Sequence, residues 1–135
     1  MAELGGPRIR RAGVPVDAVL VVRGDVLDAE LLRKDAARFR RRFAAWDRYG
    51  LSAFHAANDA EVAALCEARL VQFAEVVVFR RGDLEAAGVE VAATFRTPHV
   101  TLAAAELEEL VASLLSCEHQ VRANPYHVAE DQEPG

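Results

Sequence analysis

The sequence has few of the residues that mark a specialised class of protein. It contains two cysteines, Cys66 and Cys117, and neither belongs to a Cys-x-x-Cys pair or to a Cys/His spacing typical of zinc. We interpret both as reduced, buried thiols, because a free cysteine packs as a small hydrophobic residue. Histidines, cysteines and carboxylates are nowhere clustered at ligand spacing, so we expect no metal and no cofactor.

Long apolar runs are missing as well. Runs such as Ala18–Val22 and Val76–Phe79 are far shorter than the roughly 20 residues that cross a bilayer. No positively charged segment followed by an apolar one opens the sequence, so we expect no secretory signal. These absences favour a cytoplasmic protein without a membrane contact. No glycine-rich nucleotide-binding fingerprint occurs either.

The residues that are present suffice for one folded domain. The chain has 135 residues, 52% of them hydrophobic, and its mean hydropathy is +0.04. A single core of this size buries roughly two thirds of the surface of the unfolded chain. We expect a mobile basic arm over residues 1–13, one domain over 14–128, and a frayed acidic tail over 129–135.

Charge is unevenly distributed along the chain. Residues 1–49 hold eleven Lys/Arg against seven Asp/Glu, whereas residues 50–135 hold five against fourteen, and the chain as a whole carries −5. This asymmetry is compatible with an anionic ligand or a nucleic acid at one end of the molecule. The acidic total argues against a dedicated nucleic-acid-binding protein.

Strand and helix patterns alternate along the domain. Strands are predicted at 14–22, 51–56 and 75–81, and helices at 28–46, 58–73, 84–87 and 106–117. This alternation favours an α/β or α+β fold in which three to four helices cover a single sheet. Because a bend at Pro98 implies at least one antiparallel neighbour, we expect a mixed sheet of four to six strands.

The stretch Val89–Ala103 combines a strand pattern with polar side chains. Apolar residues alternate up to Arg96, Pro98 interrupts the strand, and alternation resumes with His99 and Thr101 on one face. One face of this stretch can therefore carry chemistry while the other packs.

The predicted helix 28–46 is strongly basic. A solvated charged face is the plainest interpretation, and the alternative is a surface that binds RNA or an acidic protein partner, since the cations repel one another. These cations are Arg33, Lys34, Arg38, Arg40, Arg41 and Arg42.

Cleavage of a phosphodiester needs a base that titrates near neutral pH, a cation and positioning donors. His99 with Arg96 and Thr101 supplies this set locally. Arg23 follows a buried strand, at the end where open α/β sheets place their ligands. Two further residues, Tyr126 and His127, are candidates for a catalytic role. Four others are candidates for substrate binding: Ser52, Tyr49, Arg122 and Asn124.

Two short motifs resemble enzyme families. Pro98-His99-Val100-Thr101-Leu102 resembles the hydrophobic-His-x-Thr-hydrophobic signature of the 2H phosphoesterases, in which two such motifs supply an acid and a base. This chain has one copy. The segments VVRG and GLSAF resemble ADP-ribosyltransferases of the arginine-serine-glutamate type, and this resemblance implies NAD-dependent roles for Arg23, Ser52 and Glu90.

In size and in its alanine- and arginine-rich composition, the chain resembles short bacterial proteins of toxin–antitoxin type. Three hypotheses follow. The first is a toxin-like protein that acts on RNA or another phosphate-bearing substrate by metal-independent acid/base chemistry. The second is a non-catalytic interaction protein that binds an acidic partner, or a second copy of itself as a homodimer, through the basic helix. The third is an ADP-ribosyltransferase-like enzyme.

Overall fold

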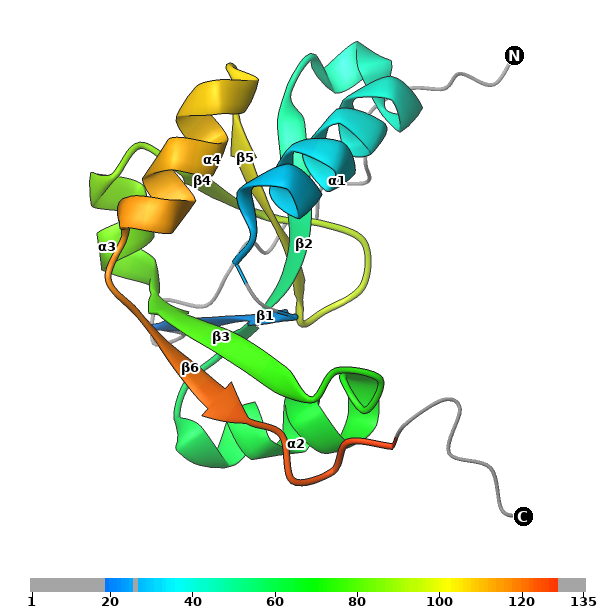
Figure 1. Cartoon of the computed structure of the whole chain (residues 1–135), viewed down its shortest axis with the longest axis vertical. Coiled ribbons are helices and arrows are strands. Elements are labelled where there is room, and N and C mark those ends of the chain that lie inside the picture. The colour runs from blue at the N-terminus through cyan, green and yellow to red at the C-terminus, as the bar shows by residue number, and fades with distance from the viewer. Residues whose placement is uncertain (1–18, 26, 129–135) are drawn as a thin grey trace.

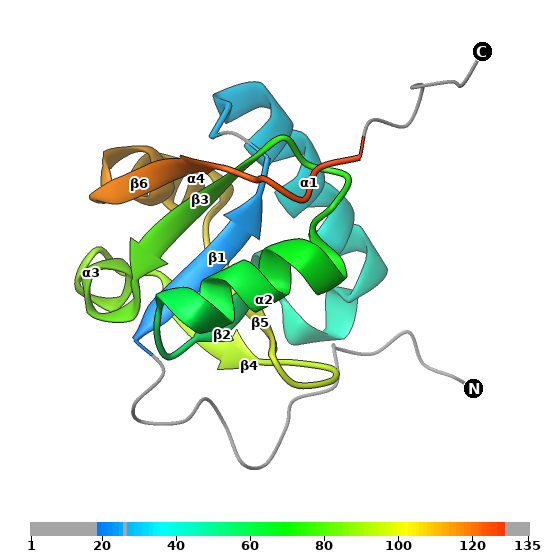
Figure 2. The ribbon, with the colours of Figure 1, turned by 90° about the horizontal axis from the view of Figure 1, so that it is seen from below.

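The structure is a computed structural model that describes residues 19–25 and 27–128. The predicted arm 1–13 and tail 129–135 lie outside these residues. Six strands form one sheet in the order β4-β5-β2-β1-β3-β6, and helices cover both of its faces (Figures 1 and 2). The strands are β1 (Leu20–Gly24), β2 (Tyr49–Ala56), β3 (Glu75–Arg80), β4 (Glu90–Ala93), β5 (His99–Ala104) and β6 (His119–Ala123). The helices are α1 (Ala29–Arg42), the 3₁₀ turn η1 (Ala44–Trp46), α2 (Asp59–Arg69), α3 (Arg81–Ala86) and α4 (Leu107–Ser116).

The predicted α+β class, single sheet and covering helices are confirmed, but the sheet is not mixed. Every strand pairing within the described residues is antiparallel. Alternating strands and helices are typical of parallel sheets, in which each helix returns the chain to its starting end. Here α1 instead runs out beside β2, and β2 itself brings the chain back (Figure 1). The helix thus carries the chain onward and β2 alone makes the return, so β1 and β2 are antiparallel.

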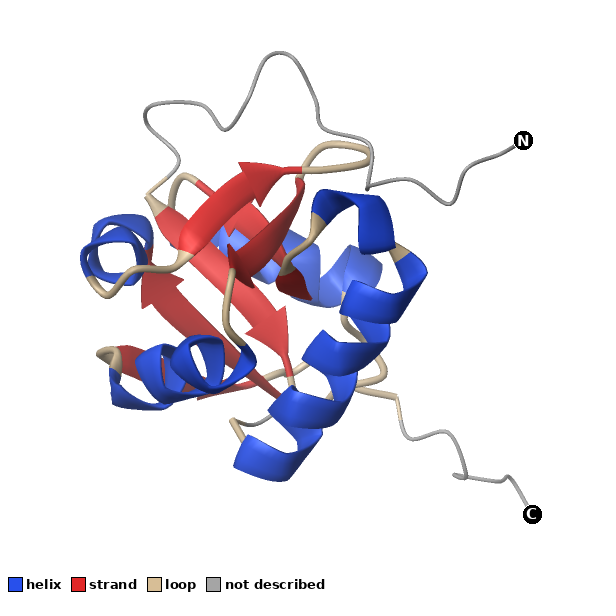
Figure 3. Cartoon of the chain, turned by 90° about the horizontal axis from the view of Figure 1, so that it is seen from above, coloured by secondary structure: helices blue, strands red, loops and turns tan. Residues whose placement is uncertain are grey.

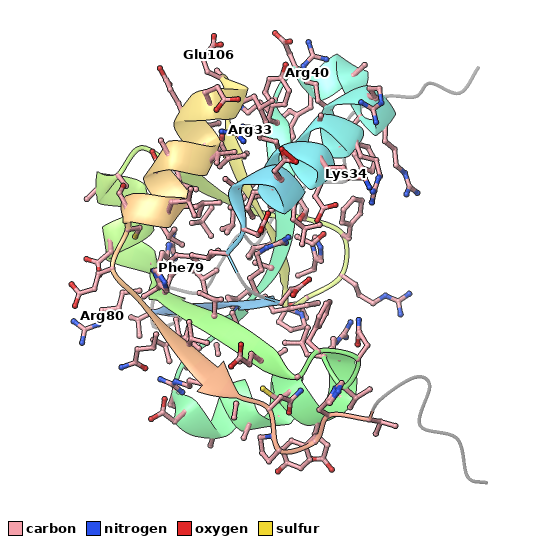
Figure 4. The ribbon with its side chains drawn as sticks, viewed as in Figure 1. Arg33, Lys34, Arg40, Phe79, Arg80 and Glu106 are labelled. Atoms are coloured by element: carbon pink, nitrogen blue, oxygen red, sulfur yellow. The ribbon has the colours of Figure 1, made fainter. Side chains whose placement is uncertain are left out.

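Side chains that alternate along the central strands supply two separate cores. On one face Val21, Leu51 and Val77 pack with residues of α1, α3 and α4, including Leu32 and Leu110. On the other face a second cluster joins the sheet to α2, and its members include Val22, Val76, Val78, Val62 and Leu65. In Figure 4, Phe79 of β3 points into the first core while its neighbour Arg80 projects to solvent. Figure 3 shows the helices disposed around the sheet from above.

Local signals in the sequence locate the starts of two helices correctly. Asp28 caps α1 by accepting a hydrogen bond from the Leu31 amide at 3.0 Å. Asn58 and Glu61 cap α2 as predicted: the Glu61 amide donates to Asn58 Oδ1 at 2.9 Å, and the amide of Ala57, one residue before the cap, donates to Glu61 Oε1 at 2.9 Å. The predicted ends are too late, since α1 ends at Arg42 and α2 at Arg69. The segment predicted to complete the first helix forms the 3₁₀ turn η1 instead, before a left-handed turn at Asp47.

Both cysteines are free and buried, as predicted. Burial raises the pKa of the Cys66 thiol and also that of the Cys117 thiol. None of the helices described is long and apolar enough to span a membrane.

Candidate functional site

The end of β1 separates from its neighbour β2. The two strands pair at three positions, from Leu20 with Ala56 to Val22 with Phe54, whereas β1 stays paired with β3 as far as Gly24. At the point of separation the Arg23 guanidinium reaches across, and its Nη1 donates to the Ser52 carbonyl oxygen at 2.9 Å. The side chain of Arg23 therefore fills the opening between the two strands.

Arg23 is a buried cation with incomplete pairing. Its residue surface is 9% exposed, and Nη2 contacts the Asp35 carboxylate of α1 at 3.4 Å, which is long for an ion pair. Its Nε is buried and has no hydrogen-bond partner among the described residues. Burial lowers the pKa of Arg23, and the nearby carboxylates of Asp35 and Asp25 partly oppose this effect. The guanidinium remains protonated, because arginine does not lose its proton in proteins, so an anion placed beside it would be strongly favoured.

Two cavities adjoin at Arg23, Asp35 and Ser52. The larger has a volume of about 470 Å³, and we call it the aromatic cavity because Phe39, Phe43 and Phe95 line it. The smaller, about 310 Å³, is the histidine cavity. It is lined by Arg23, Gly24, Asp25, Asp35, Ser52, Phe54, Arg69, Leu70, Gln72, Phe73 and His99. Both volumes lie in the range of small-molecule sites, roughly 300–1,000 Å³.

The imidazole of His99 is held by a buried pair of hydroxyls. His99 Nδ1 lies 2.8 Å from Thr94 Oγ1, which in turn lies 2.8 Å from Thr101 Oγ1. Both threonines are fully buried. The rings of Phe54 and Phe95 meet the imidazole at centroid distances of 5.5 and 5.1 Å, in edge contacts. The ring of His99 is therefore oriented from several sides, as a working acid or base must be.

The Thr94 hydroxyl lies where it can select the tautomer of His99. A hydroxyl carries one proton, so Thr94 donates to at most one of its neighbours. If Thr94 donates to Nδ1 of His99, the ring proton of the neutral imidazole resides on Nε2. If Thr94 accepts from Nδ1 instead, Nε2 is the base.

The two cavities form a positive region on an acidic protein. Four arginines line them, against two carboxylates, while the whole chain carries −5. Arg42 lies over the Phe43 ring at 5.3 Å, and Arg69 lies over the Phe54 ring at 5.7 Å. Cations and aromatic faces therefore alternate along this surface. The four arginines are Arg23, Arg38, Arg42 and Arg69.

Of the residues predicted from sequence, Arg23, Ser52 and His99 line the histidine cavity, and Thr101 lies behind His99. Arg96 does not line either cavity. It is exposed in the hairpin between β4 and β5, because Phe95 rather than Arg96 occupies the position beside the imidazole. Tyr49 packs against the first core and lies under the Arg40 guanidinium at 5.9 Å.

The predicted C-terminal residues do not line either cavity. Asn124 has a structural role: its side-chain amide donates to the carbonyls of Leu70 and Phe73, and its oxygen accepts from the Tyr126 amide. His127 contacts the Val71 carbonyl at 3.0 Å. The His127 ring is therefore held at the loop after α2, and neither Tyr126 nor His127 lines the histidine cavity.

Arg122, the last of the predicted binding residues, lies on β6 and makes an ion pair with Asp59 at 3.1 Å. The sequence predicts Arg122 as a substrate-binding residue. Because β6 is the edge strand on the far side of β3, the sheet order separates Arg122 from β2 and β5.

Glu90, which the resemblance to ADP-ribosyltransferases implies as the catalytic acid, lies on the edge strand β4. Its carboxylate pairs with Arg48 at 3.2 Å and lines neither cavity. Arg23 and Ser52 do adjoin, but without the glutamate this site has no acid in the implied position.

Several cations of the basic helix have partners inside the molecule. Arg33 binds Glu108 of α4 at 2.9 Å, Arg40 binds Asp47 at 2.6 Å, and Arg38 approaches Asp35 at 3.6 Å. In Figure 4, Arg33 lies toward α4 whereas Lys34 projects outward. Internal carboxylates thus relieve part of the repulsion that suggested an acidic partner.

Sequence reasoning missed most of the lining residues. The aromatic residues of the predicted helix 28–46 have the spacing of core positions, although Phe39 and Phe43 line the cavity. Thr94 lies on the same strand face as Glu90 and Ala92, and a hairpin about Pro98 would have brought it opposite His99. The equal spacing of Thr94 and His99 from the predicted turn was the signal in the sequence that could have placed Thr94 at the site. Within 19–25 and 27–128, no group of three metal-ligating side chains is found.

Comparison with protein-family models, with curated proteins and with solved structures gives no match to this chain. The resemblances to 2H phosphoesterases, to ADP-ribosyltransferases and to toxin–antitoxin proteins stay predictions.

Proposed function

We propose that this protein acts on RNA or another phosphate-bearing substrate in the histidine cavity, with His99 as the acid–base group. The observation that supports the proposal is the placement of His99 and Arg23, which come from β5 and β1 and line one cavity together with Arg69. A phosphate in this cavity would meet the buried guanidinium of Arg23, whose Nε has no partner among the described residues.

For RNA the reaction is an internal transfer. Neutral His99 accepts the proton of a ribose 2′-hydroxyl as its oxygen forms a bond to phosphorus, and the bond from phosphorus to the 5′-oxygen breaks. The leaving oxygen takes a proton from water. Arg23 stabilises the negative charge that develops on the phosphate oxygens. Tyr126 and His127, predicted as a second acid, lie outside the cavity and have no part in this scheme.

The test is cleavage of a labelled single-stranded RNA at several salt concentrations. His99→Ala removes the base and is expected to lower the rate by about 10²- to 10⁴-fold. His127→Ala is the matched control, since His127 is an exposed histidine outside the cavity. We expect the control to cleave at the wild-type rate. Equal rates for wild type and His99→Ala would dispose of the proposed base.

A further inference from the structure

Three phenylalanine rings in the aromatic cavity form a continuous wall outside either core. The centroids of Phe39 and Phe43 are 4.8 Å apart, and those of Phe43 and Phe95 are 5.7 Å apart. The wall continues to His99, whose ring contacts Phe95 at 5.1 Å. An aromatic wall therefore leads from the larger cavity directly to the proposed base.

Phe95 occupies its place at a conformational cost. Its φ is +57°, in the left-handed region that a bulky side chain rarely adopts. Its side chain is also one of the few large apolar groups left exposed among the described residues, at 37%. A backbone conformation that costs about 1–3 kcal/mol at a cavity wall often serves a ligand. Burial in a core does not explain this conformation, because the Phe95 ring belongs to neither core cluster.

Cations accompany the rings. Arg38 and Arg42 line the same cavity, and Arg23 lines both this cavity and the histidine cavity. A ligand that matches this surface has a flat aromatic part and a nearby negative charge. A nucleotide has both, because its base stacks on aromatic rings and its phosphate binds arginine.

We propose that the aromatic cavity holds the base of a nucleotide in single-stranded RNA, whose adjacent phosphate lies at Arg23. This assignment rests on the proposed function and names its substrate class. The rings touch one another at distances of direct contact, so the base stacks on the exposed ring of Phe95 and is not inserted between two rings. Phe95 thereby places the phosphate next to His99.

The experiment measures binding of a fluorescein-labelled RNA hexamer to the full chain. Wild type is compared with Phe95→Gly and Phe95→Leu, and Tyr126→Leu is the control because Tyr126 is an aromatic residue of similar exposure, 39%, outside both cavities. Glycine adopts positive φ freely, so Phe95→Gly relieves the backbone strain at this position while it lacks the ring. Circular dichroism and thermal unfolding verify the fold of each variant.

Both Phe95 variants should bind the hexamer roughly 5- to 150-fold more weakly, the measured range for loss of one stacked base. Tyr126→Leu should bind like wild type. Inorganic phosphate, added as a competitor, should bind wild type and Phe95 variants equally, because its contact is Arg23. If wild type binds the hexamer and the Phe95 variants bind it as tightly, the base site is refuted while the proposed function stands. If wild type binds neither RNA nor phosphate, the base site and the proposed function are both refuted.

Discussion

Gly50 of β2 gives the sharpest test of how the aromatic cavity is built. It is buried where α1 crosses the sheet, and a Cβ placed on it would lie 2.7 Å from Phe39 Cε1 and 2.7 Å from Thr101 Cγ2. Carbon atoms do not approach so closely without displacement. Thr101 is fully buried and hydrogen-bonded to Thr94, so it has little room to move. In Gly50→Ala, the ring of Phe39 must therefore shift.

The expected loss of stability can be worked out from two opposing effects. An added methyl group in a packed site costs about 1–3 kcal/mol. Replacing glycine by alanine also restricts the unfolded chain and returns about 0.4–1 kcal/mol. We expect the free energy of unfolding of Gly50→Ala to fall by about 1–2 kcal/mol, which corresponds to a fall in Tm of roughly 4–8 °C for a domain of this size.

Gly82→Ala is the matched control. Gly82 lies in α3 and is exposed, and a Cβ added to it would have no other atom within 4 Å. Alanine there removes the helix penalty of glycine, so stability should rise by about 0.5–1 kcal/mol. Urea unfolding followed by circular dichroism measures both variants. A Gly50→Ala protein as stable as wild type would show that Phe39 does not pack on β2 as described.

Three further outcomes are expected. Asn124→Ala should lower the free energy of unfolding by about 1–3 kcal/mol in urea titrations, because the buried carbonyl of Leu70 and the partly buried carbonyl of Phe73 lose their donor; no loss would contradict its structural role. Thr94→Val should shift the pH profile of RNA cleavage, because it removes the hydroxyl between His99 and Thr101; an unchanged profile would separate Thr94 from the base. Burial raises the pKa of the Cys66 and Cys117 thiols, so both should resist alkylation in the native protein and react after unfolding. Since the unfolded thiols ionise first, stability should decrease as pH rises above roughly 8.5, and an increase there would refute the assignment.

Local patterns along the chain predict much of this fold. The apolar run that contains Val76–Phe79 is buried in β3, and Asn58 with Glu61 caps α2 as its spacing indicates. These features depend on neighbours in sequence, because the spacing of apolar residues, the conformational preference of each residue and helix capping all act within one turn or one strand. The same reasoning places His99 and Thr101 on one strand face, where the pairing with β2 puts them opposite Phe54 and Ser52.

The direction of the strands and the make-up of the site follow from contacts between distant segments. The opening between β1 and β2 exists because their pairing stops at Val22 and Phe54, and no local pattern encodes where a pairing stops. The same holds for Asp35, Phe39 and Phe95, which meet beside Arg23 through the crossing of α1 and the hairpin of β4 and β5. Burial of Arg23 likewise depends on packing from several elements, and it is this burial that lowers its pKa.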